Sequence, residues 1–165
     1  MLLAQACNLC NNGNNGVHSQ HGAKVVLKGC ALDRNAGSGA YGCGVPLHAR
    51  PGGMCFGNTK SPGADLELTA CRMRYNAESG MTVVQKAHGK VFRCLSNQNG
   101  MCGVAVMSAN ATIDRTVCMN NTQHGLVVES AGWANVSRGD LSCNVQDGES
   151  SCHLTIVLIL HNPKP

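Results

Sequence analysis

One frame recurs along this chain of 165 residues: an asparagine followed four residues later by a glycine. Successive glycines of the frame are separated by 23, 41, 23, 22 and 23 residues, and 41 is one period of 23 plus an insertion of 18. The six asparagines are Asn12, Asn35, Asn76, Asn99, Asn121 and Asn144. In the first four copies a cysteine stands nine residues before the glycine, at Cys7, Cys30, Cys71 and Cys94. A repeat this short cannot bury its own apolar face, so its copies must stack on one another.

The residues before each glycine alternate between apolar and polar. In the third copy Leu66 and Leu68 are interleaved with Asp65 and Glu67, and a second short run follows the glycine, as in Met81-x-Val83. Alternation with a period of two is typical of a strand buried on one face. Each repeat is therefore expected to contain two or three short strands, and the whole chain to be all-β.

Stacking places equivalent residues of neighbouring repeats about 4.8 Å apart. Buried asparagines at that spacing are expected to hydrogen-bond to one another as a ladder, which satisfies amides that are costly to bury alone. The cysteines are expected to fill a narrow interior. The glycine is expected to supply either a positive φ or a close backbone approach. The alternative is a set of loop asparagines without a ladder.

The pattern V-x-L-x-x-C-x-L-x-x-N-x-x-x-G-h-x-V, where h is apolar, is clearest in residues 23–47 and 64–128. With it the chain resembles the right-handed parallel β-helix proteins of the pectate-lyase-like superfamily. The resemblance implies an all-β, right-handed parallel β-helix solenoid of about six to seven coils of 22–23 residues, with one long inserted loop at about 41–63. It leaves the activity open, because that superfamily contains lyases, hydrolases and epimerases of acidic polysaccharides as well as proteins that only bind or scaffold.

We expect residues 1–165 to form a single β-helix domain. Thr155, Val157 and Ile159 fall where a seventh coil would begin, so the chain is expected to be a segment of a longer solenoid or to associate end to end or edge to edge. The resemblance favours an extracellular location, although no signal peptide is seen. The net charge of +4 without a basic run argues against nucleic acid, and no apolar stretch is long enough to span a membrane.

The insertion carries Cys43, His48 and Cys55. A Cys43–Cys55 disulfide is one interpretation if the chain is secreted, and an inert surface loop is another. Zinc is disfavoured because a fourth ligand and paired spacing are lacking, so no metal site is predicted. Calcium stays open as a cofactor. The redox state of the 11 cysteines is also open.

The best candidate for catalysis is the outward set Asp65, Glu67, His88 and Lys90, on two neighbouring coils. Carboxylate, imidazole and ammonium groups within about 5 Å of one another could perform acid–base chemistry on a uronic acid or hold Ca²⁺. The interpretation favoured by the sequence is simpler: these residues form cross-strand ion pairs on a solvated face.

A column of arginines, Arg93, Arg115 and Arg138, stands ten residues before three consecutive glycines. It could follow an anionic sugar chain or equally form a solvated corner. Trp133 is expected to face outward, either as a sugar-stacking platform or as a single exposed aromatic residue. The sequence thus favours a β-helix domain that binds acidic polysaccharide, without a clear catalytic motif. The alternatives are a lyase or epimerase of uronic-acid chains and a purely structural solenoid.

Overall fold

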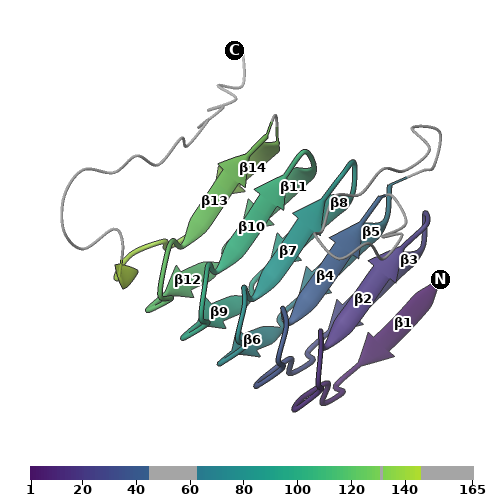
Figure 1. The fold of residues 1–165 in the computed structure, drawn as a ribbon, viewed down its shortest axis with the longest axis horizontal. Helices are drawn as coiled ribbons and strands as arrows, with labels where there is room; N and C mark the ends of the chain where they lie inside the picture. Colours follow the sequence, from purple (N-terminus) through teal and green to yellow (C-terminus); the bar gives the residue numbers. More distant parts are fainter. Residues whose placement is uncertain (45–62, 131, 146–165) are drawn as a thin grey trace.

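The computed structural model describes residues 1–44, 63–130 and 132–145. These residues form coils that stand side by side in a row, from the N-terminal purple coil to the green one (Figure 1). Each coil contributes strands to two or three parallel sheets, and no helix occurs in the described part of the chain. The prediction of an all-β parallel solenoid is confirmed.

The strands form three parallel sheets, which we call A, B and C; sheets A and C extend along most of the solenoid, whereas sheet B contains three strands. Sheet A contains, in spatial order, β1 (Leu2–Gln5), β3 (Lys24–Lys28), β5 (Asp65–Thr69), β8 (His88–Phe92), β11 (Asn110–Asp114) and β14 (Trp133–Ser137). Sheet B contains β6 (Arg72–Arg74), β9 (Leu95–Asn97) and β12 (Val117–Met119). Sheet C contains β2 (Val17–Gln20), β4 (Ala40–Cys43), β7 (Met81–Val84), β10 (Val104–Met107) and β13 (Leu126–Glu129).

The register follows the repeat. Leu66 pairs with Val25 on one side and with Gly89 on the other, so equivalent positions lie directly above one another. The insertion after β4 does not disturb this order, because β3 and β5 still pair as neighbours. The six strands of sheet A complete about five turns, slightly fewer than the six to seven coils expected. Residues 155–159, where a seventh coil was expected, lie outside the described residues.

The core lies between the three sheets and is built from the inward residues that the alternation predicted. Leu27, Leu66, Leu68 and Ile113 are at most 1% exposed. Removing aliphatic side chains of this size from water contributes about 1.5–3 kcal/mol each, which is the main force holding one coil on the next. Because each coil buries its apolar residues against those of the coils beside it, every coil depends on its neighbours.

The coils turn at three corners, and non-glycine residues with positive φ mark each of them. One corner column has φ of 49–53° and contains Ala6, Ala70, Arg93, Arg115 and Arg138. A second, with φ of 54–58°, contains Asn11, Arg34, Tyr75, Gln98, Asn120 and Cys143. The conformation costs on the order of 1 kcal/mol for such residues. The parallel ladder continues through the corners, as where Arg93 N donates to Asp114 O at 3.0 Å, and this holds the strained backbone.

The repeat glycines serve a different purpose from the corners. None of the described repeat glycines has a positive φ. Of the two roles expected for the glycine, close backbone approach is therefore the one that the structure shows. A Cβ on Gly103 would lie 2.6 Å from Gly125 O and 2.6 Å from Cys118 Cβ. Only glycine lets the backbone enter sheet C this close to the next coil.

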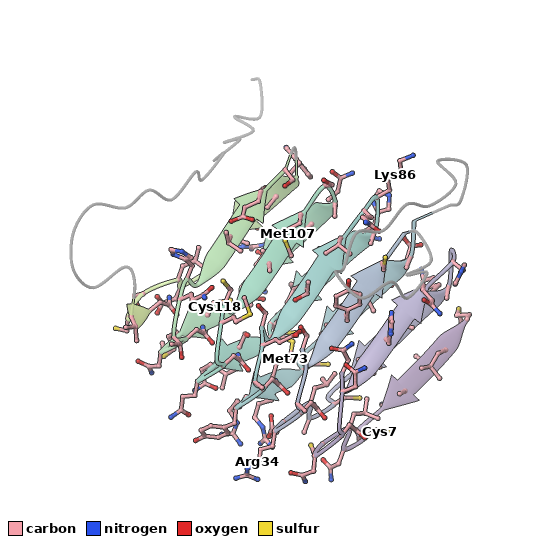
Figure 2. The ribbon with its side chains drawn as sticks, in the orientation of Figure 1. Cys7, Arg34, Met73, Lys86, Met107 and Cys118 are labelled. Carbon is pink, nitrogen blue, oxygen red and sulfur yellow. The ribbon has the colours of Figure 1, made fainter. Side chains whose placement is uncertain are left out.

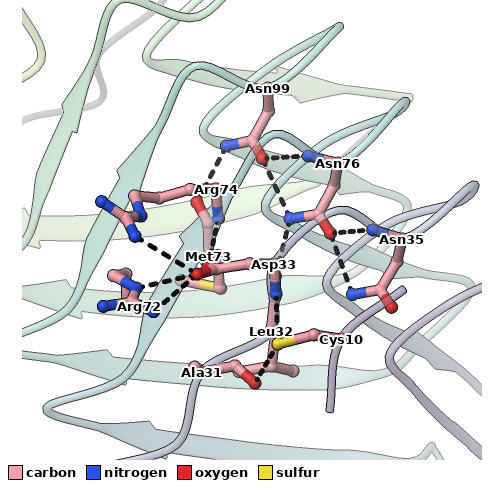
Figure 3. A network of polar contacts seen from close by, with 10 residues as sticks. All are labelled: Cys10, Ala31, Leu32, Asp33, Asn35, Arg72, Met73, Arg74, Asn76 and Asn99. Carbon is pink, nitrogen blue, oxygen red and sulfur yellow. Dashed lines mark hydrogen bonds and ion pairs between the residues drawn. The ribbon is translucent and has the colours of Figure 1, made fainter. Parts of the chain in front are cut away.

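The predicted asparagine ladder is confirmed. Each side-chain amide donates to the Oδ1 atom of the asparagine one coil further on, over N···O distances of 2.9–3.0 Å from Asn12 to Asn144. The second amide hydrogen goes to the backbone, as from Asn76 Nδ2 to Leu32 O at 2.9 Å (Figure 3). The ladder therefore joins the coils through bonds that water does not reach, except at Asn12, which is exposed.

The cysteine column also lies in the interior. Cys30, Cys71 and Cys94 are 1–2% exposed, and Cys7 in the first coil is half-buried. Their thiols donate to backbone carbonyls, as from Cys71 Sγ to Thr69 O at 3.4 Å, and Cys71 N donates to Cys94 Sγ at 3.4 Å. These cysteines are unbridged, so the column fills space rather than cross-linking coils.

Candidate functional site on the outer face of sheet A

The outward side chains of sheet A form three rows that cross the coils, and we call this surface the polar face. The first row is Lys24, Asp65, His88, Asn110 and Trp133; the second is Val26, Glu67, Lys90, Thr112 and Asn135; the third is Lys28, Thr69, Phe92, Asp114 and Ser137. The arginine column follows the third row at the corner towards sheet B. The polar face and its corner therefore carry every residue for which the sequence suggested catalysis or substrate binding.

The four candidate catalytic residues come from β5 and β8. Asp65 is the register partner of His88, and Glu67 is the partner of Lys90. Glu67 Oε1 accepts hydrogen bonds from Lys24 Nζ at 3.0 Å and from Lys90 Nζ at 3.1 Å. These two ammonium groups, Lys24 first, hold the pKa of the Glu67 carboxyl below its ordinary value. Glu67 is thus kept as a paired anion, which suits cross-strand ion pairing and does not suit a proton donor.

The insertion precedes β5, and its residues 45–62 lie outside the described part of the chain. A Cys43–Cys55 disulfide and an inert surface loop therefore both stay open as interpretations, and His48 of the disfavoured zinc site also lies outside the described residues. Cys43 itself ends β4, is fully buried, and donates from Sγ to Gln85 Oε1 at 3.3 Å.

The three arginines of the corner column have different partners. Arg138 forms a two-point ion pair with Asp114, with Nε–Oδ1 at 2.9 Å and Nη2–Oδ2 at 2.8 Å. Hydrogen bonds from Ser137 and Arg138 hold the pKa of Asp114 below its usual range. The guanidinium carbons of Arg93 and Arg115 lie 5.0 and 5.8 Å from the centre of the Phe92 ring. Neither of these two forms an ion pair with a described carboxylate, although Asp114 attracts Arg115 over a longer distance.

A hollow of about 220 Å³ adjoins this corner. Its lining consists of Glu67, Leu68, Thr69, Lys90 and Phe92. It therefore lies between the Glu67–Lys90 ion pair and the ring on which Arg93 and Arg115 stack. Sequence reasoning missed Phe92, although its place two residues after the outward Lys90 marked it as a member of the same face.

Trp133 faces outward and is 38% exposed. It begins β14, whereas Arg138 follows the end of the same strand, so roughly 16 Å of extended backbone separates the two. The tryptophan and the arginine corner are therefore separate features of the polar face. A ligand must run along the strand direction to contact both.

A second charged cluster, on sheet B, was not predicted. Asp33 is 4% exposed and accepts hydrogen bonds from Arg72 Nε at 2.9 Å and from the Arg74 backbone at 3.1 Å; Arg72 Nη2 also lies 2.7 Å from Asp33 Oδ2 (Figure 3). The side chains of Arg72 and Arg74 stay 46% and 30% exposed while they pair with this buried carboxylate. The repeat did not reveal this pairing, because the insertion separates Asp33 from Arg72 by 39 residues and from Arg74 by 41 residues.

Over residues 1–44, 63–130 and 132–145, no three His, Cys, Asp or Glu side chains converge as a metal site, and binding of calcium stays a hypothesis. Likewise, the described part of the chain contains no helix with the length and apolar character needed to cross a membrane.

Comparison with known proteins adds the family. No curated protein and no solved structure matches the chain. The family model described as "Right handed beta helix region" matches residues 2–148, which include every strand from β1 to β14. The parallel sheets and the asparagine ladder agree with that match, and the chain therefore belongs to the right-handed β-helix family.

Proposed function

We propose that this chain binds an acidic polysaccharide on the polar face of sheet A, centred on Arg93 and Arg115. The observation that carries the proposal is the pair of exposed guanidinium groups stacked on Phe92 without an ion-pair partner in the described residues. A guanidinium group binds a carboxylate through two parallel hydrogen bonds, so two adjacent arginines can hold successive acidic units.

The position of the two arginines favours a chain-like ligand. They occupy equivalent sites on neighbouring coils, so their backbones lie about 4.8 Å apart, a spacing comparable to the length of one sugar unit. Stacking on Phe92 restricts both side chains before a ligand arrives, which lowers the entropy lost on binding. An extracellular location, which the family resemblance implies, would bring the domain to such polymers.

Binding is favoured over catalysis because of Glu67. A lyase or epimerase needs a base and an acid near the sugar. The carboxylate of Glu67 is instead held in ion pairs with Lys24 and Lys90. Asp65 and His88 remain side by side, and the absorbance of unsaturated sugar ends would reveal a lyase. Product that disappears in both His88→Ala and Lys90→Ala would replace the binding function with an enzymatic one.

The test is calorimetric titration with polygalacturonate and alginate, with neutral dextran as the control polymer. We expect the double variant Arg93→Gln/Arg115→Gln to bind the acidic polymers at least about tenfold more weakly, since each buried or stacked charged contact contributes about 1 kcal/mol or more. Arg34→Gln is the matched control, because Arg34 is also an exposed corner residue stacked on an aromatic ring, at 5.6 Å from Tyr75. Equal weakening by Arg34→Gln, or equal binding of dextran, would reject the site.

A further inference from the structure

The outer face of sheet C departs from the alternation seen elsewhere. Its outward positions should be polar, but most are apolar or weakly polar: Tyr41, Thr82, Val84, Ala105, Met107 and Val127. The inward positions of the same strands, such as Met81 and Val104, are fully buried in the core. Sheet C is therefore largely apolar on both faces, whereas the outer face of sheet A is polar.

A groove of about 310 Å³ runs over this outer face. Its floor includes Thr82, Ala105 and Val127. Further along the strands it is lined by Val84 and by Met107, of which Met107 is labelled in Figure 2. The turns that precede the strands supply the opposite wall with Glu78, Met101, Gln123 and His124. The lining comes from the four consecutive strands β4, β7, β10 and β13 and their turns, so the groove crosses the coils. Thr82 and Ala105 are only 6% and 5% exposed, which shows how deep the floor lies.

The charged residues in the described lining of the groove are both acidic. Glu78 and Glu129 line it, both are exposed, and no Lys or Arg belongs to its described lining. Glu78 also accepts a hydrogen bond from Ser38 Oγ at 3.1 Å, which fixes one of its carboxylate oxygens. At one end Tyr41 is held by an edge-to-face contact with His18, with ring centres 5.0 Å apart. The groove thus has an apolar floor, a fixed aromatic end and an acidic rim.

We propose that this groove binds a small ligand with a thin apolar body and an ammonium group, that is, an aliphatic amine. Its volume lies at the lower end of the range for small-molecule sites. The apolar floor gains from covering an alkyl chain, and the carboxylates attract the ammonium group. A sugar is disfavoured here, because its hydroxyl groups would lose hydrogen bonds to water against Val127 and Met107. The two outer faces of the solenoid would then bind ligands of opposite charge.

The test uses hexylammonium, hexanoate and hexanol as probes of equal chain length, with binding measured by saturation-transfer NMR and calorimetry. Hexylammonium is expected to bind more tightly than the other two. Glu129→Gln should weaken its binding about threefold to fivefold, which is what one partly solvated charge contributes. Asp140→Asn removes the same charge from an exposed site at the end of sheet B and should leave binding unchanged.

A second variant tests the position of the alkyl chain. Met107→Arg places a cation and its bulk in the groove, and hexylammonium binding should fall at least about tenfold while the circular dichroism spectrum is retained. If that variant does not fold, Glu129→Lys at an exposed position should reverse the preference towards hexanoate. The proposal is overturned if hexanol or hexanoate binds wild-type protein as tightly, or if Asp140→Asn weakens binding as much as Glu129→Gln. The Arg93→Gln/Arg115→Gln variant should keep amine binding, which separates this site from the polysaccharide site.

Discussion

Asn99 shows how one side chain holds several parts of the solenoid together. Its Nδ2 donates to Asn121 Oδ1 at 2.9 Å and to Met73 O at 3.2 Å, and its Oδ1 accepts from Asn76 Nδ2 at 3.0 Å. Asn99 is 1% exposed, so water cannot replace these partners. Removing the amide leaves donors and acceptors unpaired on two neighbouring coils.

We therefore expect Asn99→Ala to lower the free energy of unfolding by about 2–4 kcal/mol, since each buried group left without a partner costs about 1–3 kcal/mol. Urea unfolding followed by circular dichroism measures the change. Asn12→Ala is the matched control: Asn12 makes the same bond to Asn35 but is exposed, so its loss should cost less than about 1 kcal/mol. Similar costs for the two variants would mean that the ladder does not depend on burial.

Residues that repeat in every coil were predictable, and residues that act alone were not. The ladder could be predicted because the asparagine recurs at one position. The placement of Asp65 and His88 on one outward face could be predicted from the alternation of apolar and polar residues. The pairing of Lys24 with Glu67 could not, because Lys24 is in register with Asp65 and reaches Glu67 diagonally. Register places the backbones, while the reach of a long side chain depends on its rotamer.

The turn into sheet C shows the same contrast at the level of an element. Its glycine recurs in each coil, so a special role was predictable, but the three corner columns with positive φ contain Ala, Arg, Asn, Tyr and Ser and gave no such signal. The corners are held by parallel backbone bonds rather than by a residue type, as where Arg115 N donates to Ser137 O at 3.0 Å. The apolar outer face of sheet C was missed because its strands are short and apolar residues also fill their inward positions, which leaves no clear alternation.

Gly103→Ala tests the close approach at this turn. The added methyl group would lie 2.6 Å from both Gly125 O and Cys118 Cβ, so the two coils must move apart. We expect a loss of about 1–3 kcal/mol in the free energy of unfolding, typical of overpacking in a well-packed interior. Gly13→Ala is the control, because a Cβ added there would have nothing within 4 Å, and it should change stability by less than about 0.5 kcal/mol. An unchanged Gly103→Ala protein would show that the turn has room for a side chain.

At the scale of the whole molecule, one core and one ladder run through every described coil. Each coil contacts only its neighbours, so the stability of the stack depends on the sum of these interfaces. The outer faces are not under the same constraint, which is why sheet A can be polar and charged while sheet C is apolar. The outer faces are therefore the part of the molecule that is free to carry a function.

The cysteines allow a direct measurement of that cooperativity. Cys118 is fully buried, and burial raises the pKa of its thiol to about 12. A hydrogen bond with Cys71 and burial also raise the pKa of the Cys94 thiol. Only the thiolate reacts with alkylating reagents, so at pH 8 a thiol with a pKa of about 12 has on the order of one reactive molecule in 10⁴, even before burial is considered. Cys143, in contrast, is exposed and unbridged.

We expect pulse alkylation with iodoacetamide, read by peptide mass spectrometry, to label Cys143 as fast as a peptide thiol. Cys94 and Cys118 should be labelled only when the coils unfold, at one common rate that rises with urea as the global unfolding population rises. Cys143→Ser should leave that common rate unchanged, which excludes any effect of the exposed thiol on the core. If Cys118 is labelled much faster than Cys94, the coils open one at a time and the ladder does not couple them. If both are labelled quickly in native buffer, the thiol column is not part of a closed core, and the packing described for the interior is wrong.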